Sequence, residues 1–236
     1  MIKNQSLKRS ATGLLAIWIS ALPSFGWAWH DETHIAIAKA AGYEKWFNAA
    51  GADITKIKAG DIEQSNHYVY NPPATNVTAE NVIDQAGRYN VPHDRKGHLY
   101  GAIIAATREY RTTTQSGKYA EYHMAFCAHY VGDLSQPLHN IRHTPYNQQY
   151  HIATDGIINH EVLYNLPLIE IYPIDIRSEM DLAKEIARVA NLSTELGYRL
   201  EKEGRMLSRQ EAYEQISHSA SLFRSILTFV KGSGGK

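Results

Sequence analysis

Three side chains that could bind a metal ion lie close together in residues 129 to 139, which read HYVGDLSQPLH. His129 and Asp133 are four residues apart, so on a helix their side chains share one face and can converge on a cation. Pro137 lacks an amide hydrogen and disfavours helical geometry at the residue before it, so the helix should end there and His139 should follow from a turn. A cation would also give a buried Asp133 the partner that a buried carboxylate requires.

This segment resembles the signature HYxGDxxQPxH of the zinc-dependent phospholipase C and single-strand nuclease superfamily. The resemblance implies an all-α fold, with a single compact multi-helix domain and a metal cluster at the base of a cleft. It also implies an enzyme that hydrolyses phosphodiester bonds with about three zinc ions.

The amino terminus predicts export. Residues 1 to 28 combine a basic start, an apolar stretch around residues 13 to 22, a helix breaker at Pro23 and small residues at Gly26 and Ala28. This pattern is typical of a secretory signal peptide and is too short for a membrane span. Cleavage after Ala28 would leave a mature domain of residues 29 to 236, secreted or periplasmic, that begins with Trp29.

The resemblance gives Trp29 a role, because mature members of this superfamily bind zinc through the amine and carbonyl of an N-terminal tryptophan. A histidine follows shortly afterwards in those proteins, and His34 lies at the corresponding spacing. A neutral α-amine is a good zinc ligand, and its reference pKa near 8 allows it to lose a proton beside a dication.

The other ligands are predicted by carrying the resemblance along the chain. Asp61 and His67 correspond to an aspartate and a histidine that face the first zinc, although the segment between them is short. A second HxxxD pair is expected after His139, and His151 with Asp155 has that spacing. His160 with Glu161 is the alternative, but adjacent helical residues point about 100° apart and do not easily bind one ion.

The resemblance therefore implies three metal sites. The first is predicted to use Asp61, His67, His129 and Asp133, the second His139, His151 and Asp155, and the third Trp29, His34 and the other oxygen of Asp133. Nitrogen and oxygen ligands without thiolates are typical of catalytic zinc. Asp61 is alternatively a general base for the attacking water.

Composition disfavours duplex nucleic acid as the substrate but does not distinguish phospholipid from single-stranded nucleic acid. Lys+Arg and Asp+Glu are both 24, so no strong positive field indicates binding to duplex nucleic acid, and the single Cys127 excludes an intramolecular disulfide. Phospholipid at a membrane surface is the favoured substrate. Single-stranded nucleic acid is the alternative, and a non-catalytic zinc-binding protein is a further one. A monomer without a stable protein partner is expected.

Helical periodicity dominates the rest of the sequence. A capping box at Ser208 and Glu211 marks the start of the last predicted helix. Residues 71 to 96 are predicted to form a surface loop, and residues 166 to 176 an extended connector interrupted by Pro167 and Pro173. The predicted helices cover residues 33 to 41, 97 to 111, 118 to 132, 181 to 203 and 208 to 231.

Overall fold

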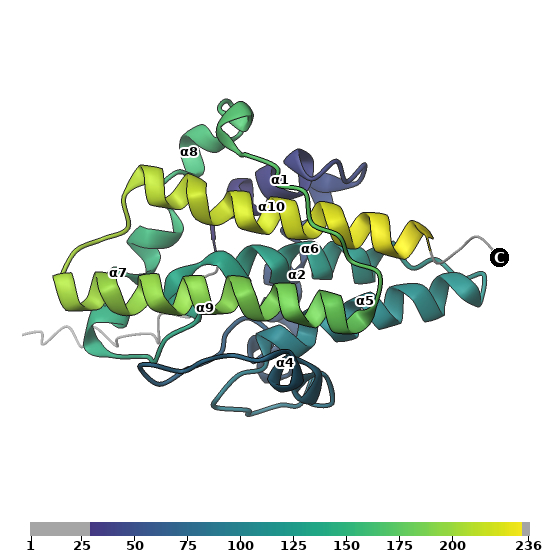
Figure 1. Cartoon of the computed structure of the whole chain (residues 1–236), viewed down its shortest axis with the longest axis horizontal. Coiled ribbons are helices and arrows are strands. Elements are labelled where there is room, and N and C mark those ends of the chain that lie inside the picture. Colours follow the sequence, from purple (N-terminus) through teal and green to yellow (C-terminus); the bar gives the residue numbers. More distant parts are fainter. Residues whose placement is uncertain (1–28, 233–236) are drawn as a thin grey trace, which may run out of the picture.

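The computed structural model describes residues 29 to 232, and within them the chain is mainly helical (Figure 1). These residues contain no β-strand, and the one β-bridge outside named strands joins Asn71 to Ile141. The expectation of an all-α architecture is confirmed. The predicted signal peptide lies outside the described residues. Among the described helices, none is both long and apolar enough to cross a membrane.

The helices follow one another in the order of their labels. The α-helices are α1 (Asp31–Ala40), α2 (Gly51–Ala59), α3 (Asp61–Gln64), α4 (Ala79–Ala86), α5 (Leu99–Gln115), α6 (Glu121–Ser135), α7 (Pro145–Asp155), α8 (Asn159–Val162), α9 (Glu179–Glu203) and α10 (Arg209–Gly232). Short 3-10 helices are η1 (Trp46–Asn48), η2 (Pro137–His139) and η3 (Leu166–Leu168).

The five predicted helices correspond to α1, α5, α6, α9 and α10, with ends displaced by a few residues. The capping box before α10 is present, since the Ser208 amide donates to the Glu211 carboxylate at 2.9 Å and the Glu211 amide donates to Ser208 Oγ at 3.2 Å. These helices could be predicted because their apolar positions recur over three or more turns.

The prediction of a loop over residues 71 to 96 is wrong in part, because α4 lies inside it. Thr78 and Asn81 form a capping box at its start. Val82 is fully buried, and α4 packs against α5 and α9. A helix of about two turns is marginal in isolation, so packing rather than intrinsic propensity stabilises it.

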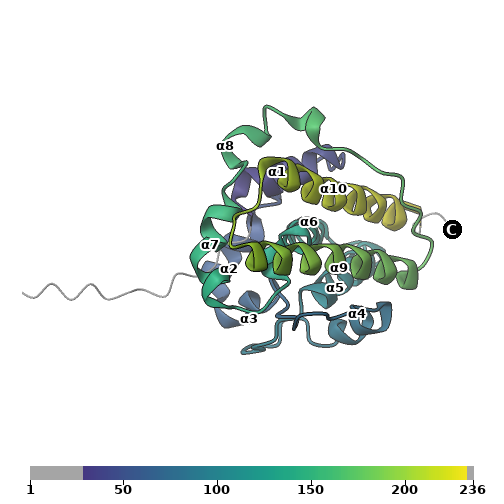
Figure 2. The same cartoon turned by 60° about the vertical axis from the view of Figure 1, so that its left-hand side comes forward.

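Helix α6 lies at the centre of the molecule, in contact with α5, α10, α9 and α1 (Figures 1 and 2). Its residues from Cys127 to Ser135 are all buried. This position surrounds the HYVGD segment with other helices. Polar groups on α6 therefore have to find partners inside the protein.

The connector predicted over residues 166 to 176 is extended only from residue 169, because residues 166 to 168 form η3. Serines on α10 satisfy its backbone in place of a neighbouring strand. Ser217 Oγ accepts from the Glu170 amide at 2.9 Å, Ser221 Oγ accepts from the Tyr172 amide at 2.8 Å, and Ser225 Oγ donates to the carbonyl of Ile174 at 2.9 Å.

Candidate metal centre

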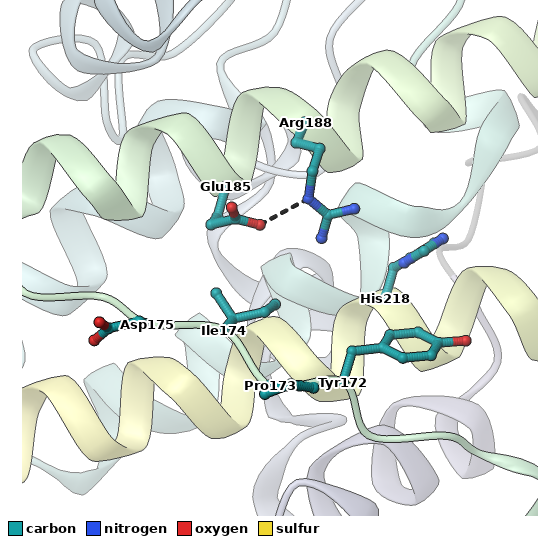
Figure 3. A pocket seen from close by; sticks show the side chains of 7 residues that line it. All are labelled: Tyr172, Pro173, Ile174, Asp175, Glu185, Arg188 and His218. Atoms are coloured by element: carbon teal, nitrogen blue, oxygen red, sulfur yellow. Dashed lines mark hydrogen bonds and ion pairs between the residues drawn. The ribbon is translucent and has the colours of Figure 1, made fainter.

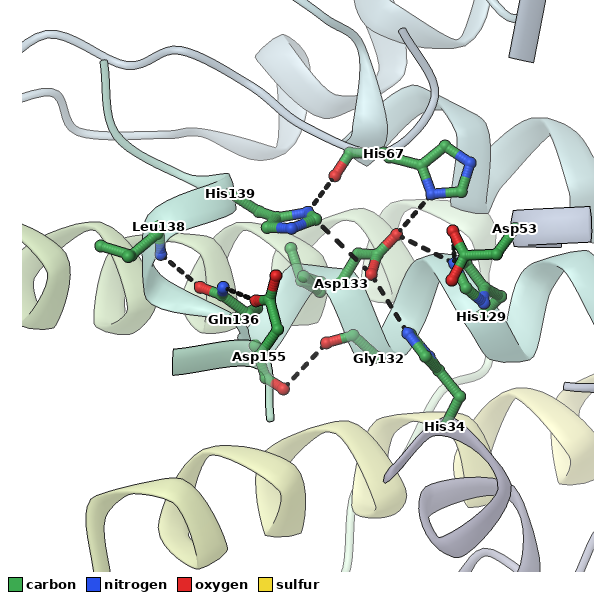
Figure 4. A network of polar contacts seen from close by, with 12 residues as sticks. His34, Asp53, His67, His129, Gly132, Asp133, Gln136, Leu138, His139 and Asp155 are labelled. Carbon is green, nitrogen blue, oxygen red and sulfur yellow. Dashed lines mark hydrogen bonds and ion pairs between the residues drawn. The ribbon is translucent and has the colours of Figure 1, made fainter. Parts of the chain in front are cut away.

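The end of α6 presents His129 and Asp133 to one buried space (Figure 4). Both side chains are fully buried, and His129 Nε2 lies 3.4 Å from Asp133 Oδ2. The helix ends at Ser135, and Gln136 adopts an extended ψ of 114° before Pro137 begins η2. His139 therefore follows from a turn, as the sequence predicts.

Asp133 joins side chains from separate elements. Its Oδ2 accepts from His67 Nδ1 at 2.8 Å, and its Oδ1 lies 3.4 Å from Nε2 of His34 on α1. Figure 4 shows the carboxylate between these imidazoles, with His139 on its other side. The two oxygens of Asp133 thus face different histidines, which is the arrangement needed for a carboxylate that bridges two metals.

One candidate metal group contains Asp53, His67 and His129, whose ligand atoms all lie within 4.8 Å of one another. Asp53 is a buried residue of α2, and its Oδ1 lies 3.6 Å from His129 Nε2. The sequence analysis missed Asp53 and named Asp61, whose side chain is outside the part that the structure describes. The role predicted for Asp61 therefore stays a prediction.

A second group contains His139, His151 and Asp155, the set predicted from the HxxxD spacing. His151 and Asp155 come from α7, and His151 Nε2 lies 3.6 Å from Asp155 Oδ2. The alternative pair lies elsewhere: His160 is exposed, and Glu161 forms an ion pair with Arg209. The structure therefore brings together the first of the two pairs that the sequence offered.

The third group contains His34, His129 and Asp133. The His34 and His129 rings are stacked, with centroids 3.8 Å apart. The Trp29 side chain is fully buried, and the His30 amide donates to the carbonyl of Asp155 at 3.2 Å. The start of the described chain is thus tied to α7 near the second group. Zinc binding by the Trp29 amine remains a prediction.

Hydrogen bonds orient the histidines toward the cluster. His129 Nδ1 donates to the Ala49 carbonyl at 2.9 Å, His139 Nδ1 donates to the His67 carbonyl at 2.5 Å, and His151 Nδ1 faces Asn147 Oδ1 at 2.7 Å. These partners assign the proton to Nδ1 and leave the Nε2 lone pair free. Fixing one ring nitrogen through a carbonyl is the usual way in which proteins orient metal-binding histidines.

Several other buried atoms of these residues form no hydrogen bond in the protein. The buried side-chain atoms without a hydrogen bond include Nε2 of His34, His67, His129, His139 and His151, together with Oδ1 of Asp133 and Oδ2 of Asp155. An unpaired buried polar atom costs about 1–3 kcal/mol, so a cluster of this size is unfavourable without a ligand. Cations bound to these nitrogen and oxygen atoms would remove the cost, and the residues therefore fit a metal cluster.

Burial keeps three of the histidines neutral, whereas Asp133 and Glu63 raise the pKa of His67 against the effect of its burial. Burial lowers the pKa of His129 to about 3, with His34 acting in the same direction, and it lowers the pKa of His139 and His151. These rings are neutral near pH 7, which is the form that binds a metal.

The pKa values of the Asp133 and Asp155 carboxyl groups are shifted in opposite directions. Burial opposes ionisation of Asp133, but His129 and His139, with His34 and His67 acting in the same direction, hold its pKa well below the usual range. Burial raises the pKa of Asp155 well above the usual range. Asp155 therefore needs a nearby positive charge in order to stay ionised near neutral pH.

Two further charged residues lie against the cluster. Lys56, on the same side of α2 as Asp53, places Nζ 2.8 Å from Asp53 Oδ1 and is largely buried. Glu63 is also buried, accepts a hydrogen bond from Tyr130 and lies 3.5 Å from His67 Nε2. A buried ammonium beside a carboxylate supplies positive charge at the cluster, and Glu63 restrains the imidazole of His67.

A separate surface cavity of about 390 Å³ lies between the extended connector and the helices α9 and α10 (Figure 3). Its lining includes Tyr172, Arg188 and His218, and Arg188 is already paired with Glu185 at 2.7 Å. None of the predicted metal ligands lines it. The cavity is therefore not part of the candidate metal centre.

Comparison of this chain with models of protein families, with characterised proteins and with solved structures gave no match. The functional assignment therefore depends on the chemistry of the candidate metal centre and on the sequence signature within it.

Proposed function

We propose that this protein is an exported zinc-dependent hydrolase of phosphodiester bonds that acts as a phospholipase C. The observation that carries the proposal is the convergence of five histidine Nε2 atoms and two aspartate oxygens, all buried and unpaired, at one end of α6. The signature in α6 and η2 supports zinc and phosphodiester chemistry. The helical architecture is compatible with the fold that the resemblance implies.

The three groups of the candidate centre would hold the metals. Asp53, His67 and His129 would hold one ion, His139, His151 and Asp155 a second, and His34 with Asp133 a third, completed by the Trp29 amine after signal cleavage. Bound zinc would lower the pKa of a water molecule toward neutrality and neutralise charge on the phosphate oxygens.

The residues around the metals have roles that follow from their charges. Asp53 would accept the proton of the attacking water, the role that the sequence offered for Asp61 as an alternative to metal binding. The water oxygen forms a bond to phosphorus while the bond from phosphorus to the glycerol oxygen breaks, and the glycerol oxygen takes up a proton. The Lys56 ammonium, 2.8 Å from Asp53, would compensate the negative charge of the entering phosphodiester.

Single-stranded nucleic acid is the second candidate substrate, and one observation favours it. Tyr68 and Tyr70 are stacked with centroids 4.2 Å apart, and Tyr70 is nearly parallel to His143 at 5.9 Å. Tyr68 and Tyr70 closely follow His67 in the chain. Aromatic side chains near a phosphodiesterase site can stack on unpaired bases.

The experiment is a comparison of substrates with the processed protein, residues 29 to 236. Hydrolysis of a chromogenic phosphocholine ester, phosphatidylcholine and single-stranded DNA is measured before and after removal of metal by a chelator, and again after zinc is restored. We expect phosphocholine and phosphatidylcholine hydrolysis that the chelator abolishes and zinc restores. Hydrolysis of DNA alone would replace phospholipase with nuclease, and full activity of Asp133→Asn would overturn the metal mechanism.

A further inference from the structure

Helix α2 has two chemically different faces. Asp53 and Lys56 are buried on the face toward the metal centre. Beside these buried residues, Ile54 is 61% exposed and Ile57 is 64% exposed, on the side of α2 that faces outward. Isoleucine is among the residues most often buried in proteins, so two such exposed side chains on one helix indicate a surface with a binding partner.

The apolar surface extends beyond α2. Ile54 and Ile57 are three residues apart and therefore neighbours on the helix. Ile62, in the adjoining α3, is 47% exposed, and Phe47, in η1, is 59% exposed. Phe47 lies in η1, which a turn at Ala49 and Ala50 joins to α2. Helices α2 and α3 contact each other (Figure 2).

We propose that Ile54 and Ile57 of α2, with Ile62 of the adjoining α3, form a membrane-docking surface that inserts into the interfacial region of a phospholipid bilayer. This inference rests on the proposed function, because a phospholipase C must reach a phosphodiester that lies at the bilayer surface. Helix α2 would take part in both membrane docking and hydrolysis, because its buried side supplies Asp53 to the metal centre. A helix with its side chains is about 10–12 Å across, so docking on the outer face would hold the metal centre close to the headgroups.

Charge on this surface also fits a phospholipid. Lys58 is exposed on α2, whereas the acidic residue of the helix, Asp53, faces inward. A lysine next to exposed isoleucines matches an interface with phosphate groups above an acyl layer. The surface therefore combines apolar anchors with a positive charge, as interfacial membrane-binding helices do.

The test is co-sedimentation of the processed, zinc-loaded protein with phosphatidylcholine vesicles, with and without phosphatidylglycerol. We expect Ile54→Glu and Ile57→Glu each to weaken vesicle binding by about tenfold or more, since each replaces an inserted apolar side chain by a charge. Lys58→Gln should weaken binding about fivefold, and only to vesicles that contain phosphatidylglycerol. Met180→Glu, at an exposed methionine of α9, is the matched control and should bind and hydrolyse as the parent does.

Thermal unfolding and zinc content establish that the variants are folded. The ratio of vesicle hydrolysis to hydrolysis of a soluble phosphocholine ester should fall as vesicle binding falls.

Equal vesicle binding by the parent and the isoleucine variants would overturn the docking surface even if the enzyme is a phospholipase C. A change from dimer to monomer in Ile57→Glu with unchanged vesicle binding would assign the surface to a second copy of the chain. If the parent binds single-stranded DNA but no vesicles, both the docking surface and the phospholipase proposal fail. If it binds vesicles through these isoleucines but hydrolyses no phospholipid, only the proposed function fails.

Discussion

Gly132 leaves the space in which the imidazole of His34 lies. A Cβ atom at position 132 would come within 2.4 Å of His34 Nδ1 and 2.7 Å of Cε1, closer than real contacts allow. The glycine of the HYVGD segment therefore allows α1 to bring His34 against α6 and within 3.4 Å of Asp133.

This relationship predicts the effect of Gly132→Ala. Alanine favours an α-helix over glycine by about 1 kcal/mol, but here the methyl group must displace His34. We expect loss of one bound zinc and a fall in activity of about 10–100-fold, measured by metal analysis and phosphocholine ester hydrolysis. Gly87→Ala, where the nearest atom would be 3.9 Å from the new Cβ, is the control and should leave both unchanged. A full zinc complement in Gly132→Ala would show that His34 is not a ligand.

A second prediction tests whether Asp53 or Asp61 is the metal ligand. Asp53 shares a candidate metal group with His67 and His129, so Asp53→Asn should remove a metal and reduce turnover by about 100-fold or more. Asp61→Asn is measured beside it, because the sequence predicts Asp61 as the ligand. Zinc content and kcat of both variants decide the matter. Normal turnover in Asp53→Asn together with an inactive Asp61→Asn would restore the assignment made from the sequence.

The third prediction concerns the HxxxD pair. His151→Ala should abolish hydrolysis and lower zinc content, because the Nε2 of His151 is buried and unpaired beside Asp155. His160→Ala is the control, since that side chain is exposed. Both variants are assayed for zinc and for phosphocholine ester hydrolysis. The reverse pattern, with only His160→Ala inactive, would contradict the second metal group.

The fourth prediction concerns the amine of Trp29. Extra residues before Trp29 turn its amine into an amide without an available lone pair, so an extended protein should lack one zinc and be much less active than the processed form. Cleavage at Trp29 should restore both. Equal zinc content and turnover in the two forms would exclude the amine as a ligand.

The fifth prediction concerns the pH dependence of folding in the zinc-free protein. The pKa of His129 is about 3 when folded and near 6.5 when unfolded, so the unfolded state binds more protons between these values. His129 therefore stabilises the folded state less as the pH falls below about 6.5, with a slope that approaches about 1.4 kcal/mol per pH unit. His67 and Asp155, whose pKa values are raised, act in the opposite direction.

Comparison with His129→Gln isolates this contribution. Urea unfolding at several pH values should give a smaller loss of stability on acidification for His129→Gln than for the parent, whereas His160→Gln should follow the parent. An identical pH dependence in His129→Gln and the parent would show that His129 is not buried in its neutral form.

The sequence by itself determined the local parts of this site. The spacing of His129 and Asp133 and the stop at Pro137 are properties of a few consecutive residues, and α6 and η2 follow from them. The long helices α9 and α10 could be predicted for the same reason, because their apolar residues repeat over many turns.

Only the tertiary structure decided which distant residues join α6. Asp53 lies in a nine-residue helix with little apolar pattern, and nothing local to it indicates that α2 packs with one face toward His129. Helix α4 escaped prediction because contacts with α5 and α9 stabilise it. The choice of His151 and Asp155 over His160 and Glu161 likewise depends on where α7 and α8 lie. Periodicity encodes the face that a helix buries, but the packing of whole helices determines which side chains then meet.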